Sequence, residues 1–153
     1  MNVQNIRLRE FREEDRPLIL STWWKSLKDP PTFDVHIPDP IYRREKKAVV
    51  NKLLDGAVTL VAHELDDEDK ILGYICGEAS LPVIHYVYVK RIYTGFGIAR
   101  LLVDTYCNAL EDSRVVTISH ITHAFTTRFF NQKPNNSRFT YNPYILKELG
   151  YDV

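Results

Sequence analysis

The stretch from residue 83 to residue 110 constrains the fold more than any other part of the chain. Residues 83–89 are rich in Val, Ile and Tyr, which is typical of a strand covered on both faces. After a turn that contains Gly95 and Gly97, apolar residues recur at helical spacing: Ile98, Leu101, Leu102, Tyr106, Ala109 and Leu110. The pattern predicts a strand, a glycine turn and a helix in direct succession.

The turn between this strand and this helix has the chemistry of an anion site. Glycine accepts either sign of φ and lets the oxygens of a ligand approach the backbone amides closely. The first N–H groups of a helix have no partner within the helix, and the helix dipole adds positive charge beside them. A purely structural turn would also use glycines, so the flanking elements have to support the functional interpretation.

Those flanking elements predict one α/β domain over residues 1–153, with a central mixed sheet (α+β) flanked by helices. Two expectations concern single residues: Asp15 caps the first helix, and Gly73 and Gly77 mark a bulge or a close backbone approach. The expected elements are a strand at 6–11, helices near 16–27 and 41–54, an antiparallel hairpin of 57–64 with 71–79, and a strand at 115–119 parallel to 83–89.

Composition excludes several classes of function. Twenty basic and twenty acidic residues balance, which argues against a nucleic-acid or anionic-membrane partner. No apolar run approaches the roughly 20 residues of a membrane span. Cys76 and Cys107 fit two reduced thiols, so we expect a cytoplasmic protein. The sequence leaves open whether it is a monomer or a homodimer. His120 and His123 lack a third ligand at a recognisable spacing, so we expect no metal.

The spacing V-x4-T-x-x-G-x-A, from Val89 to Ala99, resembles the acyl-CoA pyrophosphate signature of the GCN5-related N-acetyltransferases (GNAT). That signature reads V-x4-(Arg or Gln)-x-x-G-x-(Gly or Ala), so Thr94 departs from it. The opening IRLREFREED and the closing residues 144–151 resemble the ends of family members, although Leu146 stands where the family carries a Tyr. The resemblance implies a GNAT-like acyl-CoA N-acyltransferase fold.

The resemblance also implies a co-substrate and an acceptor. Acetyl-CoA would bind through the end of the strand and the glycine turn, and an amine of a small molecule or protein would receive the acetyl group. No metal is implied. The residues assigned to acetyl-CoA are Tyr88, Val89, Thr94, Gly95, Phe96, Gly97, Ile98, Ala99 and Arg100.

Acetyl transfer to an amine calls for a base and an acid. His85 is the first candidate base, because arylalkylamine-type members of the family carry a working histidine on this strand; a hydrogen-bonded core histidine is the alternative. Glu78 is the second candidate base; the alternative is that it is simply an exposed residue at the end of a strand. Tyr141 and Tyr144 are candidate acids that would give a proton to the departing thiolate; the alternative is that both have only a packing role.

Two functional hypotheses remain from the sequence. The first is an acetyl-CoA-dependent N-acetyltransferase. The second is a catalytically weak or inactive acetyltransferase-like protein that binds a protein partner, a class also met in bacteriophages; Thr94 and Leu146 at family-marked positions favour it.

Overall fold

One mixed sheet organises the chain in the computed structural model, which describes residues 3–27, 36–110, 115–120 and 138–152. Within these residues the sheet has six strands in chain order. The first four strands are antiparallel, and β4, β5 and β6 are parallel. The mixed α+β sheet is therefore confirmed. The strands are β1 (Ile6–Glu10), β2 (Val58–Glu64), β3 (Asp67–Gly77), β4 (Val83–Val89), β5 (Val116–Ile118) and β6 (Phe139–Tyr141).

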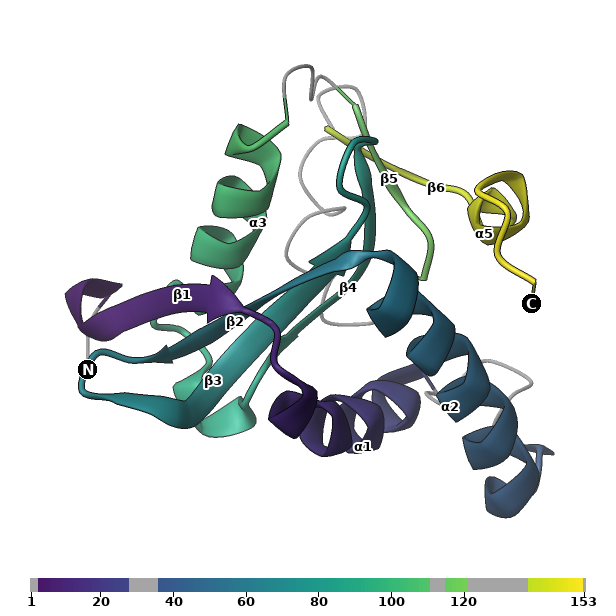
Figure 1. Cartoon of the computed structure of the whole chain (residues 1–153), viewed down its shortest axis with the longest axis horizontal. Coiled ribbons are helices and arrows are strands. Elements are labelled where there is room, and N and C mark those ends of the chain that lie inside the picture. Colours follow the sequence, from purple (N-terminus) through teal and green to yellow (C-terminus); the bar gives the residue numbers. More distant parts are fainter. Residues whose placement is uncertain (1–2, 28–35, 111–114, 121–137, 153) are drawn as a thin grey trace.

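Helices cover both faces of this sheet (Figure 1). Helices α1 (Arg16–Leu27) and α2 (Asp39–Gly56) lie on one face, and α3 (Ile98–Asn108) lies on the other. A short helix, α5 (Ile145–Glu148), follows β6. Because α3 connects the parallel strands β4 and β5, the predicted strand–helix–strand unit is confirmed. No helix in the described ranges has the length and apolar character needed to cross a membrane.

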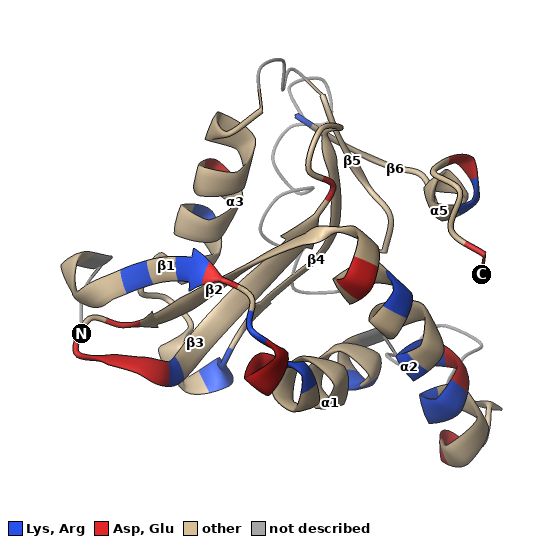
Figure 2. Ribbon diagram, in the orientation of Figure 1, with Lys and Arg blue, Asp and Glu red and all other residues tan. Residues whose placement is uncertain are grey.

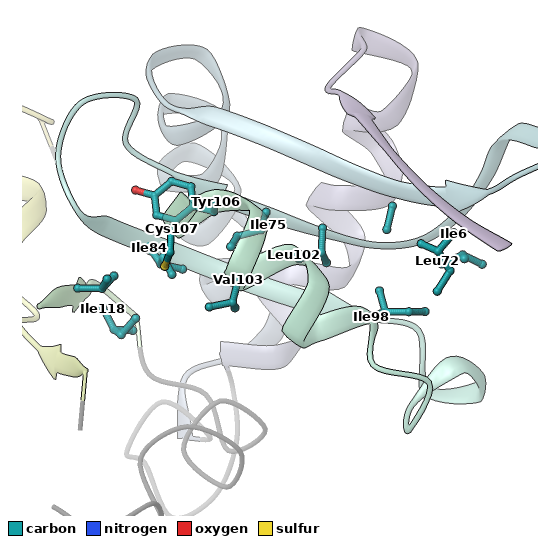
Figure 3. Packing of buried hydrophobic residues seen from close by; sticks show 12 residues of the cluster. Ile6, Leu72, Ile75, Ile84, Ile98, Leu102, Val103, Tyr106, Cys107 and Ile118 are labelled. Carbon is teal, nitrogen blue, oxygen red and sulfur yellow. The ribbon is translucent and has the colours of Figure 1, made fainter. Parts of the chain in front are cut away.

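Helix α3 packs through one apolar stripe, as its sequence spacing predicts. Ile98, Leu102 and Tyr106, spaced four apart, are all buried. They meet the strand residues Leu72 and Ile75 in the core shown in Figure 3. Each large apolar side chain buried in this way stabilises the fold by about 1.5–3 kcal/mol. The stripe therefore fixes the start of α3 directly against the end of β4.

The opposite face has a second core, beneath α1 and α2. Trp23 is fully buried and stacks on Tyr86 of β4, with ring centroids 4.9 Å apart. The segment around α5 closes this core with Leu146 and the half-buried Tyr151. Residues from the first and last parts of the chain thus share one core.

Two expectations differ from the structure in detail. Asp15 does not cap α1: its carboxylate accepts the Arg12 N–H at 2.8 Å and pairs with Arg9 at 2.7 Å, because a short 3-10 turn, η2 (Glu13–Asp15), precedes the helix. Strand β3 begins at Asp67, earlier than predicted, because Asp67 pairs with Glu64 of β2 after a tight turn. Figure 2 shows these acids at the turn and the basic residues along α2.

A bulge in β4 confirms the expectation raised by the glycines of β3. Cys76 pairs with Tyr86 but its neighbour Gly77 pairs with Ile84, so His85 is an extra residue. A Cβ on Gly77 would lie 2.6 Å from the Tyr106 ring. The missing side chain therefore leaves room for that ring beside the bulge.

Beyond the bulge, β4 separates from β5. The register pairs only Val83 and Ile84 with β5, so in the described part of the chain the rest of β4 has no strand on that side. Lys90 N–H donates to Leu72 O at 2.9 Å, which makes the preceding β4 residue a non-hydrogen-bonded partner of β3. By alternation, the N–H and C=O of Val87 point away from β3. Strand β4 thus has an open edge.

Candidate functional site

The glycine turn opens directly into solvent. A short 3-10 helix, η4 (Arg91–Tyr93), follows β4, and Gly97 then forms the N-cap of α3 with φ of 83°. Gly95 has φ of 95°, and a Cβ placed on it would meet nothing within 4 Å. Residues with a side chain rarely adopt these φ angles, so the backbone conformation of the turn requires glycine at both positions.

The backbone amides of this turn are free to bind a ligand. The first hydrogen bond of α3 runs from Leu101 N–H to Gly97 O at 3.0 Å. Among the described residues, the amides of residues 95–100 donate to no carbonyl ahead of that bond. Arg91 and Arg100 are exposed beside them and add positive charge. Free amides, a helix N-terminus and two cations together favour an anion.

The residues that sequence analysis assigned to acetyl-CoA fall into two groups. Val89, Ile98 and Ala99 direct their side chains into the protein, so only their backbone groups can face a ligand. Tyr88 lies on the α1 and α2 face, with its ring centroid 5.2 Å from that of Tyr74. Exposed side chains in the turn are those of Thr94, Phe96 and Arg100.

The other end of β4 holds a buried chain of hydrogen bonds between polar side chains. His85 is fully buried; its Nδ1 lies 2.7 Å from Ser119 Oγ and its Nε2 lies 3.2 Å from Glu78 Oε2. Ser119 Oγ also lies 2.8 Å from His120 Nδ1. Tyr151 donates its hydroxyl to Glu78 Oε2 at 2.9 Å. The two candidate bases, His85 and Glu78, are therefore in direct contact.

The bulge and the Tyr106 ring position this chain. Tyr106 of α3 donates its hydroxyl to Val83 O at 2.7 Å, and its oxygen also lies 2.9 Å from Glu78 O. These contacts hold the β3–β4 connection, which carries Glu78, against the sheet. Tyr151 is held from the other side, because Gly56 lacks a side chain: a Cβ there would lie 3.1 Å from the Tyr151 ring.

Burial controls the charge of both imidazoles. Desolvation lowers the pKa of His85, and the hydrogen bond to Glu78 opposes that change. Desolvation also lowers the pKa of His120, to about 3, and the neighbouring His85 and then Lys46 lower it further. Both histidines are therefore neutral at pH 7. Burial raises the pKa of the Tyr151 hydroxyl above its ordinary value, and Glu78 adds to that rise.

The two candidate acids lie apart from this chain. Tyr141 is 45 % exposed on the outer strand β6, and Tyr144 is 74 % exposed at the start of α5. Neither hydroxyl makes a hydrogen bond to any described residue, and neither contacts Glu78 or His85. Tyr151, which sequence analysis did not select, is the tyrosine that reaches the carboxylate.

Sequence reasoning missed Ser119, His120 and Tyr151. His120 had been considered only as a metal ligand with His123, which lies outside the described residues. A signal was present, because His85 and Ser119 fall on neighbouring parallel strands. However, the bulge at His85 cannot be counted from strand alternation. In the described ranges no group of three or more His, Cys, Asp or Glu is placed to hold a metal ion.

A basic hollow lies between Trp24 of α1 and the first turns of α2. It has a volume of about 490 Å³ and is lined by Trp24, Asp39, Pro40, Arg43, Arg44 and Lys47. The Arg43 guanidinium lies 5.7 Å from the centroid of the Trp24 ring, and Arg44 pairs with Glu45 at 3.1 Å. The basic residues of α2 are thus partly engaged with neighbours, as expected for the outer face of a helix.

Comparison with solved structures supports the architecture. A possible acetyltransferase from Clostridium difficile 630 superposes with a TM-score of 0.55 at 18% identity, over 90% of this chain and 93% of that one. A proposed acetyl transferase from Pyrococcus furiosus gives a TM-score of 0.50 at 15% identity, over 97% and 93% of the two chains. YjaB from Escherichia coli, in its apo form, matches at 24% identity and a TM-score of 0.49, over 69% of this chain and 66% of YjaB. At these identities the likeness concerns the fold alone.

A family model gives the assignment. No curated protein matches this chain. The model of the acetyltransferase (GNAT) family matches residues 9–132, which include β4, the glycine turn and α3. That match covers well over half of the chain, so this protein belongs to the acetyltransferase (GNAT) family.

Proposed function

We propose that this protein is an acetyl-CoA-dependent N-acetyltransferase that acts on an amine. The observation that carries the proposal is the path formed by β4: free amides at the glycine turn, an open strand edge beside it, and a buried histidine–carboxylate pair at its far end. Acetyl-CoA supplies the acetyl group as a thioester. The chain's own residues have to bind it, orient it and remove a proton from the amine.

The glycine turn suits the pyrophosphate of acetyl-CoA. The amides of residues 95–100 would hold the phosphate oxygens, and the open space at Gly95 lets them approach. The open edge of β4, through Val87 N–H and C=O, could pair with the amides of the pantetheine arm as an added strand would. Laid along this edge, the ligand would direct its thioester from the turn towards His85.

Glu78 and His85 suit proton removal as a unit. A neutral imidazole that donates Nε2–H to a carboxylate keeps its other nitrogen as an acceptor. His85 itself is fully buried, so it has no surface on which an amine could rest. The side chain of Glu78 is 15 % exposed, which gives the proton an exit to solvent.

The leaving thiolate needs little help from the protein. An ordinary thiol has a pKa of about 8.5, so a thiolate survives for a useful time near neutral pH and can take its proton from water. Tyr141 and Tyr144 remain the proposed acids, but Tyr141 lies two strands from β4, roughly 10 Å away. We therefore expect only small losses of activity from Tyr141→Phe or Tyr144→Phe.

The surroundings of this activity follow from the same residues. Cys76 and Cys107 are buried free thiols, which supports a reducing, cytoplasmic compartment. The acceptor is an amine of a small molecule or a protein. The alternative, a protein that binds a partner without catalysis, has no feature in its favour among the described residues beyond Thr94 and Leu146 at family-marked positions.

Two measurements test the function in sequence. Acetyl-CoA at 100 times its dissociation constant should stabilise the protein by about 2.7 kcal/mol, which raises the melting temperature by about 5–10 °C. Pantetheine, which lacks the pyrophosphate, should have a much smaller effect. A panel of arylalkylamines, polyamines, aminoacyl compounds and lysine peptides is then assayed by CoA release. Binding without acetylation of any amine would favour the partner-binding alternative. Absence of acetyl-CoA binding would rule out both the assignment of the turn as its site and the proposed acetyl transfer.

A further inference from the structure

The buried hydrogen bonds around His85 have only one consistent direction. Glu78 Oε2 receives the hydroxyl of Tyr151, and it also lies against His85 Nε2. An ionised carboxylate can only accept, so Nε2 of His85 carries the proton. Because burial keeps His85 neutral, its Nδ1 is then an acceptor and must receive the hydroxyl proton of Ser119 at 2.7 Å.

The same reasoning fixes the tautomer of His120. A hydroxyl has a single proton, and that of Ser119 is already directed to His85. The short contact of 2.8 Å between Ser119 Oγ and His120 Nδ1 therefore requires His120 to donate Nδ1–H. Neutral His120 then carries a lone pair on Nε2, and no described residue forms a hydrogen bond to that nitrogen.

His120 also occupies the right place. It follows Ser119, whose N–H donates to Ile84 O at 3.1 Å in the last contact between β4 and β5. The open edge of β4 begins there. The side chain of His120 is only partly covered, whereas that of His85 is fully buried. The His120 ring lies edge-on to the Trp23 ring, with 6.3 Å between the ring centroids.

We propose that His120 receives the proton of the acceptor amine and that Ser119 and His85 relay it to Glu78. This inference rests on the proposed acetyl transfer and extends it to residues outside the sequence-based site. As the nitrogen bonds to the acyl carbon and the carbon–sulfur bond breaks, its surplus proton moves to His120 Nε2. His120 Nδ1–H passes to Ser119, the hydroxyl proton passes to His85 Nδ1, and His85 Nε2–H passes to Glu78. The thiolate takes a proton from water.

The balance of charge explains why a relay suits this site. Each imidazole gives up one proton for the one that it gains, so neither has to remain charged in a buried place. Only Glu78 changes charge, from carboxylate to acid, at the end nearest to solvent. Lys46, which lies close enough to oppose protonation of His120, also disfavours an ammonium ion beside it and so favours the neutral amine.

The direction of the hydrogen bonds is tested without a substrate. In protein labelled with ¹⁵N in its histidine rings, long-range ¹⁵N–¹H correlations report which nitrogen carries the proton, and His85→Asn and His120→Asn assign the signals. We expect His85 with its proton on Nε2 and His120 with its proton on Nδ1, both neutral at pH 7–8. In Ser119→Ala, His120 should lose its fixed tautomer. His120 with its proton on Nε2 in the wild-type protein would overturn the relay.

Kinetics test the relay itself. Ser119→Ala leaves His85, Glu78 and His120 in place but interrupts the chain, so kcat should fall about 10²- to 10⁴-fold while acetyl-CoA affinity stays within about twofold. Ser119→Thr keeps a hydroxyl and should recover most of the rate. Thr59→Val removes a buried hydroxyl from β2 that takes no part in the relay. This variant is the matched control and should retain full activity.

Non-additivity separates a relay from independent packing effects. The double variant Ser119→Ala with His120→Asn should lose no more activity than the worse single variant, because either change breaks the same path. If Ser119→Ala keeps kcat within about threefold in an active enzyme, the relay fails and the proposed function stands. If the wild-type protein binds acetyl-CoA and acetylates no amine, the proposed function fails, and the relay with it.

Discussion

The two ends of β4 differ in the groups that they present: one end presents backbone groups and the other presents side chains. At the glycine turn, the proposed binding of acetyl-CoA depends on the backbone: amides without a carbonyl partner among the described residues, two glycines at positive φ and a helix N-terminus. At the bulge, the candidate groups are side chains that are buried or half-buried and hydrogen-bonded to one another. The turn is made by one continuous segment, whereas the buried chain joins residues 78, 85, 119, 120 and 151.

This difference indicates that the two ends can be damaged separately. A backbone site depends on φ angles and open space, so it tolerates changes of neighbouring side chains. A side-chain relay depends on each proton donor and acceptor, so the loss of one atom stops it. Binding of acetyl-CoA and turnover should therefore respond to different substitutions.

The largest effect is expected from Glu78→Gln. The amide keeps the shape of the side chain but cannot accept the relayed proton, so kcat should fall about 10²- to 10⁴-fold. Acetyl-CoA affinity, measured by calorimetry, should not change. Glu64→Gln replaces another strand-end carboxylate, which pairs with Lys70 at 2.9 Å, and serves as the control. A Glu78→Gln enzyme with normal turnover would place the base elsewhere.

Gly97→Val should abolish binding at the other end. Valine opposes the φ of 83° and puts a side chain where the phosphates are expected, so acetyl-CoA affinity should fall about 100-fold or more, on the order of 3 kcal/mol. Gly150→Val imposes a similar strain, at φ of 90° in open space, away from the turn. If both variants fold and both bind acetyl-CoA normally, the site lies elsewhere.

Stability should depend on pH through the buried histidines. The pKa of His120 in the folded protein is lowered to about 3, below the 6.5 of the unfolded chain, so unfolding takes up a proton in acid. Its contribution is fully present above pH 6.5 and is lost as the pH falls, by about 1.4 kcal/mol per pH unit. Between pH 5.5 and 4.5, His120→Asn should reduce the slope of the unfolding free energy by that amount.

The control for this slope is His36→Asn, because His36 is exposed and is not part of the hydrogen-bonded group around His85. Urea unfolding at several pH values gives the free energies. An unchanged slope in His120→Asn would show that His120 is already protonated in the folded protein at pH 4.5–5.5, so that the fold does not lower its pKa.

The smallest effect is expected from Thr94. Its side chain is exposed and the amides that follow it form the proposed anion site, so Thr94→Ala should change acetyl-CoA affinity by less than about twofold. Thr94→Arg, which restores the family residue, should tighten binding a few-fold through added charge. A large loss in Thr94→Ala would mean that the hydroxyl contacts the ligand directly.

The same contrast explains how much the sequence could predict. The order of strands and helices, the hairpin and the turn follow from local periodicity and glycine placement, and the structure confirms them. Local patterns also selected His85 and Glu78 as candidates, and the structure brings these two side chains into contact. They could not place Tyr151 against Glu78, because that contact depends on how α2, through Gly56, leaves room for a ring from a distant segment.

The position of a bulge within a strand is the second limit on prediction from sequence. A regular β4 would put His85 and Tyr86 on opposite faces of the sheet. The extra residue instead brings His85 to the face where Glu78 and Tyr151 lie, and nothing in VIHYVYV marks it. Asp15 shows the same limit on a small scale, since Arg9 and Arg12 take the carboxylate that a helix cap would use.

The contact between Tyr151 and Glu78 has a consequence for the order of events during synthesis. The two residues are 73 positions apart, and a ribosome adds about 5–20 residues per second, so roughly 4–15 s pass between their appearances. During that interval the nascent sheet can already hold Glu78 and His85 without the tyrosine that later covers them. The hydrogen bond between Tyr151 and Glu78 would then form after the hairpin and the glycine turn.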